Sequence, residues 1–150
     1  MNKVNYAHLM KTISSLTEGE EDVVSLMATV VCELHHSDHR FDWTGFYRVT
    51  SPGMLKIGPY QGIHGCLKIP FERGVCGAAA RLGKTQLVAD VEAFEGHIAC
   101  ASSTMSELVL PIWDKAGALI AVLDIDSDQP NAFTEQDAAE LEIILAKVFS

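Results

Sequence analysis

Residues 106–127, SELVLPIWDKAGALIAVLDIDS, decide the fold. Two apolar runs, SELVLPIWD and ALIAVLDIDS, lie on either side of DKAG, whose residues favour a turn. The segment therefore predicts an antiparallel hairpin. A turn centred between Lys115 and Ala116 would place Glu107 directly opposite Asp124.

Three acidic side chains of this hairpin are predicted to share one face of the sheet. Asp126 follows Asp124 by two residues, so the two side chains point the same way, roughly 6–7 Å apart. Glu107 joins them in the expected register, although a slip of one residue would send it to the other face. Because opposed like charges destabilise a sheet, a bound cation, either a metal or an ammonium group, would account for the cluster. The alternative is that the strand ends are solvated and the acids are surface charges.

The flanking sequence predicts a second hairpin and several helices. FDWTGFYRVT and MLKIGPYQG are aromatic and β-branched runs separated by SPG. Apolar residues recur at helical spacing over residues 6–16 and 22–37, and Thr134 can cap a last helix with Asp137 at its third position. Because the strands come as hairpins, we expect an α+β fold in which helices pack on one face of a central antiparallel sheet. Residues 1–150 contain no repeat or linker and are predicted to form a single domain.

Composition narrows the range of functions. The chain has 150 residues, of which 48% are hydrophobic and 21% charged, as in ordinary globular proteins. The formal net charge of −9 would repel a phosphate backbone, so we expect no nucleic-acid partner. MNKVNYAHLM lacks the apolar run of a signal peptide, and no stretch approaches the length of a membrane span. We therefore expect a cytoplasmic protein that does not bind a membrane.

Three cysteines, Cys66, Cys76 and Cys100, lie in the middle of the chain. In a reducing compartment such a cluster is more often metal-binding or catalytic than a structural disulfide. Cys66 and Cys100 are predicted to lie in loops. Cys76 follows Gly74 at the start of a short Ala-rich helix, where the helix dipole is expected to favour the thiolate, with a buried core position as the alternative.

Three further residues, Cys32, His64 and His97, bear on this cluster. Cys32 is predicted to face solvent on the second helix and is assigned no chemistry. His97 could assist ionisation of Cys100, but a role in packing its loop is the better interpretation. A zinc site built from the three thiols with His64 or His97 lacks the close spacing of common structural sites, so no metal site is predicted.

Several blocks of the sequence resemble the free methionine-(R)-sulfoxide reductase family, which is built on a GAF domain. They are WTGFY (43–47), GPYQG (58–62), IPFERGVCGAAA (69–80), TQLVADVEAFEGHIAC (85–100), SELVLPI (106–112) and VLDIDS (122–127). The resemblance covers roughly residues 41–130. It implies a GAF-like antiparallel sheet flanked by helices, an oxidoreductase acting on the free amino acid, and frequently a homodimer.

The resemblance also implies a thiol mechanism without a bound cofactor. Cys100 would attack the sulfoxide sulfur and become a sulfenic acid after methionine leaves. Cys66 would be the principal resolving thiol and Cys76 its auxiliary. A thioredoxin-type dithiol would then reduce the resulting disulfide.

The substrate site follows from the same resemblance. Glu107, Asp124 and Asp126 would bind the substrate amine and help to protonate the departing oxygen. Trp43 and Tyr47 would form an aromatic wall for the S-methyl end, unless they simply pack in the core.

At one position the chain departs from the pattern of the family. The family usually has an aspartate after the nucleophile, where this chain has Ala101, which puts any contribution of that aspartate in doubt here.

The competing interpretation is a non-catalytic GAF module that senses a ligand or its own thiol oxidation. A sensor would normally be joined to an output domain, for which we expect no room in a chain of this length.

Overall fold

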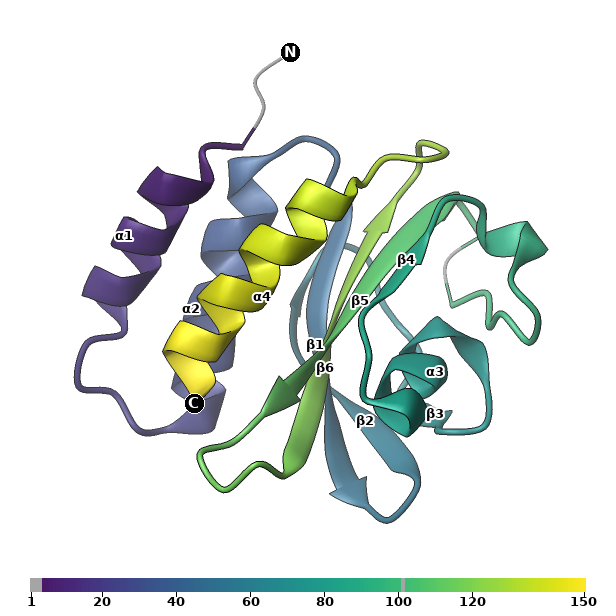
Figure 1. Cartoon of the computed structure of the whole chain (residues 1–150). Coiled ribbons are helices and arrows are strands. Elements are labelled where there is room, and N and C mark those ends of the chain that lie inside the picture. The colour runs from purple at the N-terminus through teal and green to yellow at the C-terminus, as the bar shows by residue number, and fades with distance from the viewer. Residues whose placement is uncertain (1–3, 101) are drawn as a thin grey trace.

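The fold is one six-stranded antiparallel sheet with helices on both faces (Figure 1). It was obtained as a computed structural model, and it describes residues 4–100 and 102–150. The strands lie in the order β3-β2-β1-β6-β5-β4. In chain order the elements are α1 (Tyr6–Leu16), α2 (Val23–Ser37), β1 (Trp43–Ser51), β2 (Met54–Gln61), β3 (Lys68–Pro70), α3 (Gly74–Leu82), β4 (Gln86–Val88), the 3₁₀ turn η1 (Val91–Ala93), β5 (Ser106–Trp113), β6 (Leu119–Ser127) and α4 (Glu135–Phe149).

Two hairpins form the centre of the sheet, as the sequence predicts. β1 pairs with β2, β5 pairs with β6, and β1 and β6 join the two hairpins. β3 and β4, three residues each, were not predicted as strands and form the two edges. The α+β fold with a central antiparallel sheet is therefore confirmed.

The expectation that the helices pack on one face is wrong. α1, α2 and α4 lie together on one side of the sheet, whereas α3 lies on the other (Figure 1). The first face carries the larger core, which includes Phe46, Leu123 and Ile125. The second face packs against α3 through a smaller core that includes Val122 and Ala79. α3 can cover this face because its first turns are almost entirely small or apolar and buried.

The register of the β5–β6 hairpin differs by two residues from the one expected. Glu107 lies opposite Asp126, and Asp124 lies opposite Val109. Two features add up to this difference. The turn spans three residues, 115–117, and the Asp114 carboxylate accepts hydrogen bonds there from the backbone N–H groups of Ala116 and Ala118. The pairing then shifts by one more residue between Trp113 and Ile112. A shift of two residues leaves each side chain on its original face, so the expected shared face survives.

The predicted helix ends are those of the structure. Asp22 caps α2, and Thr134 and Asp137 form a reciprocal capping box at the start of α4. Asp137 also accepts hydrogen bonds from Arg40 at 2.8 Å and from the Tyr6 hydroxyl at 2.6 Å. This carboxylate thereby ties α1 and the loop before β1 to the last helix. Within the described part of the chain, no helix combines the length and the hydropathy that a membrane crossing requires.

Candidate active site

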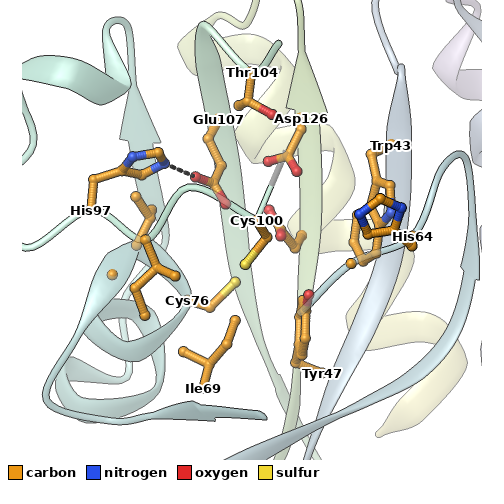
Figure 2. Close-up of a pocket in the computed structure, with 15 residues that line it drawn as sticks. Trp43, Tyr47, His64, Ile69, Cys76, His97, Cys100, Thr104, Glu107 and Asp126 are labelled. Carbon is orange, nitrogen blue, oxygen red and sulfur yellow. Dashed lines mark ion pairs between the residues drawn. The ribbon is translucent and has the colours of Figure 1, made fainter. Parts of the chain in front are cut away.

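A small cavity lies on the sheet face that α3 covers (Figure 2). Its free volume is about 30 Å³, which is room for one or two water molecules and far below the ~300 Å³ of an ordinary small-molecule pocket. A ligand the size of an amino acid therefore requires the lining loops to move. The lining residues are Trp43, Tyr47, His64, Gly65, Ile69, Gly74, Val75, Cys76, His97, Ile98, Cys100, Thr104, Glu107, Asp124 and Asp126.

The structure brings the three predicted carboxylates together in this cavity. Glu107 on β5 pairs with Asp126 on the neighbouring β6, and Asp124 lies two residues earlier on β6. Glu107 and Asp124 are only 6% and 4% exposed. Alternation along β6 sends Asp124 and Asp126 to this face, while Leu123 and Ile125 enter the core on the opposite face.

Burial and mutual repulsion make these carboxylates weak acids. The pKa of Glu107 is raised well above its ordinary value, first by burial and then by the charge of Asp124. Burial likewise raises the pKa of Asp124, with the charge of Asp126 adding to it, and the pKa of Asp126, with the charge of Glu107 adding to it. The cluster therefore favours either bound protons or a bound cation.

No lysine or arginine stands among the described residues that line the cavity. The Oδ1 atoms of Asp124 and Asp126 are buried and have no hydrogen-bond partner among residues 4–100 and 102–150. His97 Nε2 lies 3.8 Å from Glu107 Oε1, but burial lowers the pKa of His97, so the imidazole is mostly neutral at pH 7 (Figure 2). The described lining therefore offers these carboxylates no permanent positive charge.

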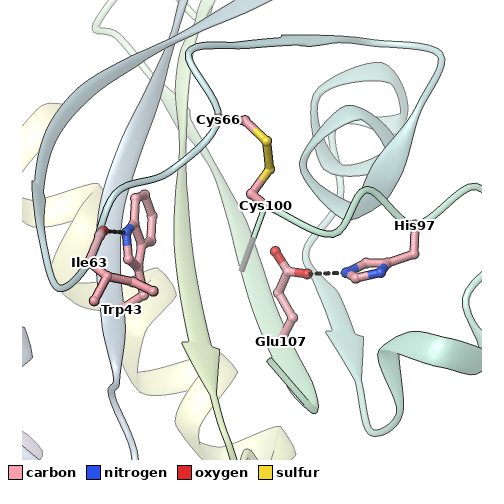
Figure 3. Close-up of a disulfide and its surroundings, with 6 residues drawn as sticks. All are labelled: Trp43, Ile63, Cys66, His97, Cys100 and Glu107. Carbon is pink, nitrogen blue, oxygen red and sulfur yellow. Dashed lines mark hydrogen bonds and ion pairs between the residues drawn. A yellow bond between two sulfur atoms is a disulfide. The ribbon is translucent and has the colours of Figure 1, made fainter. Parts of the chain in front are cut away.

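Two aromatic rings line the cavity beside the carboxylates, on the neighbouring strand β1, where Trp43 pairs with Asp126. Trp43 and Tyr47 project from β1 with ring centroids 5.8 Å apart in a stacked arrangement, and Tyr60 stacks on Trp43 at 5.3 Å. The Trp43 indole N–H donates a 2.7 Å hydrogen bond to the carbonyl oxygen of Ile63, which fixes the loop before β3 (Figure 3). Both predicted aromatic residues thus pack in the core and line the cavity at once.

A disulfide joins Cys66 to Cys100 beside the cavity (Figure 3). Cys66 lies in the loop between β2 and β3, and Cys100 in the loop between β4 and β5, as the sequence predicts. The two loops come from opposite edges of the sheet. Because both thiols are consumed in the disulfide, neither can ligate a metal in this state.

Of the two sequence predictions for Cys76, the buried core position is confirmed. Cys76 is the third residue of α3, is buried, and has no disulfide partner. Burial raises its pKa well above the ordinary value, and the charges of Asp124 and Glu107 raise it further. The prediction of a stabilised thiolate is therefore wrong, because desolvation and nearby anions outweigh the helix dipole.

The remaining predicted residues fall in three places. Cys32 is exposed on α2, as expected, with its sulfur 4.0 Å from His36 Nδ1. His97 faces Glu107 rather than acting only in loop packing. Ala101 lies outside the described residues.

Some cavity residues were missed in the sequence. Ile98 and Ile69 supply apolar lining, and Gly74 adopts a left-handed φ of 73°. A Cβ at Gly74 would come within 3.3 Å of the Ile98 side chain, and its N–H donates to the Gly96 carbonyl oxygen at 2.9 Å. These contacts fasten the Cys100 loop to the start of α3. The glycines beside Cys66 and Cys76 are the sequence signal that could have located these residues. Helix and strand periodicity does not predict which residues of a loop point into a cavity.

Comparisons with known proteins agree with this architecture. Residues 17–148 match the GAF domain family. The free methionine-R-sulfoxide reductase of Escherichia coli is 38% identical over 99% of this chain and 89% of its own length. The reduced form of fRMsr from Staphylococcus aureus superposes with a TM-score of 0.93 at 37% identity, covering 98% of this chain and 94% of that one. Free methionine-R-sulfoxide reductase from Neisseria meningitidis, in complex with its substrate, superposes with a TM-score of 0.89 at 39% identity, covering 95% and 85%. The chain belongs to the GAF-domain family and, within it, to the free methionine-(R)-sulfoxide reductases.

Proposed function

We propose that this protein reduces free L-methionine-(R)-sulfoxide to L-methionine. The observation that carries the proposal is a disulfide between Cys66 and Cys100 beside a cavity that holds three carboxylates. No lysine or arginine among the described lining residues pairs with these carboxylates. A thiol pair supplies the two electrons of the reduction, and the carboxylates suit the charged amine of a free amino acid. Relatives that share most of this chain's length bear the same activity in their names.

Cys100 is the proposed nucleophile. Its sulfur attacks the sulfoxide sulfur, and the sulfoxide oxygen takes up a proton. The sulfur–oxygen bond of the substrate then breaks, the oxygen passes to the Cys100 sulfur as a hydroxyl group, and methionine leaves, so that Cys100 becomes a sulfenic acid. The Cys66 thiol then attacks the Cys100 sulfur, water leaves, and the disulfide forms. The two thiols are oxidised by two electrons, and the sulfoxide is reduced by two.

Glu107, Asp124 and Asp126 are the proposed amine and proton site. Their raised pKa values, caused first by burial, allow a carboxyl group to hold a proton near neutral pH and to donate it to the departing oxygen. The substrate ammonium supplies the positive charge that the remaining carboxylates lack. A peptide-bound methionine has an uncharged amide at that position, so the free amino acid is the expected substrate.

The apolar end of the substrate is proposed to lie against Trp43 and Tyr47. Their stacked rings present a buried aromatic surface beside the carboxylates, on the neighbouring strand β1, which suits an S-methyl group. Cys76, a buried thiol lining the same cavity, is proposed as the auxiliary resolving thiol.

A thioredoxin-type dithiol is the proposed reductant. Cys66 and Cys100 are both half-buried, so a partner thiolate can approach the disulfide. Ile63 and Leu67, on either side of Cys66, are 59% and 71% exposed and give that partner an apolar surface to dock on. We also propose a homodimer, on the ground of family membership, and a cytoplasmic location, where such a dithiol keeps the cycle running.

The test is turnover with dithiothreitol as reductant. Free R-sulfoxide is compared with free S-sulfoxide and with an N-acylated peptide form of the R-sulfoxide. Only the free R form is expected to turn over, and equal activity on the peptide form would refute the proposed specificity. Cys100→Ser is expected to abolish turnover, with Cys32→Ser as the matched control because Cys32 is an exposed thiol on the opposite helical layer.

The sensor alternatives give different results in a single-turnover experiment. For the reductase, mixing reduced protein with one equivalent of R-sulfoxide yields one disulfide and one methionine. A ligand sensor would bind without thiol oxidation. A redox sensor would form the disulfide with peroxide and release no methionine from the sulfoxide.

A further inference from the structure

Cys76 forms a mixed sulfur and oxygen cluster with two of the carboxylates. One donor atom each from Cys76, Glu107 and Asp124 lies within 4.8 Å of the other two, and all three residues are buried. α3, β5 and β6 each contribute one of them, so the donors are fixed by the packing of three different elements.

The Oδ1 atom of Asp124 is a buried acceptor within this cluster. That atom has no hydrogen bond in the described structure, although its residue is 4% exposed. An unpaired buried acceptor destabilises the folded protein, and a cation relieves the penalty. The site is thus electrostatically complementary to a positive ion.

The donor set selects the type of ion. Thiolate is a soft ligand that favours Zn²⁺, Co²⁺ and similar transition metals, whereas Mg²⁺ and Ca²⁺ favour oxygen alone. Tetrahedral zinc with bonds of about 2.0–2.3 Å needs donors roughly 3.3–3.7 Å apart, so side-chain shifts of about an ångström would complete the site. Three protein ligands leave the fourth position for water.

We propose that Cys76, Glu107 and Asp124 bind Zn²⁺ and related transition-metal ions. Binding converts the Cys76 thiol to a thiolate and releases its proton to solvent, so affinity rises with pH. The Cys66–Cys100 disulfide uses none of these donors, so the oxidised protein keeps the site. Because Glu107 and Asp124 are also the proposed amine site, Zn²⁺ and substrate compete, a consequence that rests on the proposed function.

The experiment uses the disulfide form without sulfoxide, so its result does not depend on turnover. Co²⁺ is titrated while the thiolate-to-cobalt charge-transfer absorption is followed, and Zn²⁺ binding is measured by calorimetry. Wild type and Cys32→Ser are expected to bind one equivalent with the charge-transfer band. Cys76→Ser is expected to lose the band and to bind Zn²⁺ at least tenfold more weakly.

A second variant keeps the test decisive if Cys76→Ser does not fold. Glu107→Gln retains the thiol and is expected to lower Zn²⁺ affinity at least tenfold. The proposal is overturned if wild type binds no metal, if the band survives in Cys76→Ser, or if Glu107→Gln binds as tightly as wild type. Loss of the band in Cys32→Ser would place the metal at Cys32 and His36 on α2 and would equally overturn it.

Discussion

Reduction of the Cys66–Cys100 disulfide is expected to change the stability of the whole domain. The bond closes a loop with a sequence separation of 34 residues and joins segments from opposite edges of the sheet. The chain-entropy relation for a loop of that length gives about 3.8 kcal/mol at 25 °C in favour of the oxidised form. For a domain of this size, that corresponds to a melting temperature roughly 8–16 °C higher.

Urea unfolding, followed by far-UV circular dichroism with and without dithiothreitol, measures this difference. Cys32→Ser should reproduce the wild-type gap, whereas Cys100→Ser, which removes the thiol shared by the Cys66 bond and the auxiliary Cys76 bond, should unfold at the same urea concentration under both conditions. A gap below about 1 kcal/mol in wild type, or one that persists in Cys100→Ser, would refute the reasoning from loop closure.

Three other predictions test the site and the fold. Burial and the charge of Asp126 raise the pKa of Asp124 in the folded protein above its ordinary value of 3.8, so wild type loses stability as the pH rises from 3.8 through the raised pKa. Asp124→Asn should therefore unfold at a higher urea concentration at pH 7, with a free energy of unfolding about 1–3 kcal/mol larger. Below pH 3.8, where wild type is protonated in both states, the variant should show no gain. Leu67→Glu should raise the KM for thioredoxin about tenfold, while turnover with dithiothreitol stays unchanged. Arg40→Met leaves the buried carboxylates of Asp38 and Asp137 unpaired, and thermal or urea unfolding should show a loss of about 3–5 kcal/mol.

The secondary structure was largely predictable because its signals are local. α2, α4 and both central hairpins follow from periodicity, caps and turn residues within single segments. β3 and β4 were not, because a three-residue edge strand is defined by the neighbour it pairs with. The position of α3 on the second face of the sheet could not be predicted either. Its small residues can pack against either face, so the sequence does not specify which one they cover.

The sequence predicted which side chains of the candidate site share a face of the sheet, but it did not predict the pKa values of the groups in the site. The expected register differs from the observed one by two residues, which leaves every side chain on its original face. Glu107, Asp124 and Asp126 therefore still converge despite the wider turn at Asp114. The thiol of Cys76 shows the limit, because its pKa is set mainly by burial and by carboxylates from β5 and β6, far from it in sequence. Pairing of Cys66 with Cys100 depended on resemblance to a family, since spacing alone allowed other pairs.

Strand β6 assigns its two sets of alternating residues to separate tasks. Leu123 and Ile125 hold the three-helix core, while Asp124 and Asp126 between them face the cavity. Mutations can therefore explore new ligand chemistry at one set of positions without disturbing the packing that the other set maintains. Such a division allows a GAF sheet to diversify during evolution from one cavity specificity to another at little risk to folding.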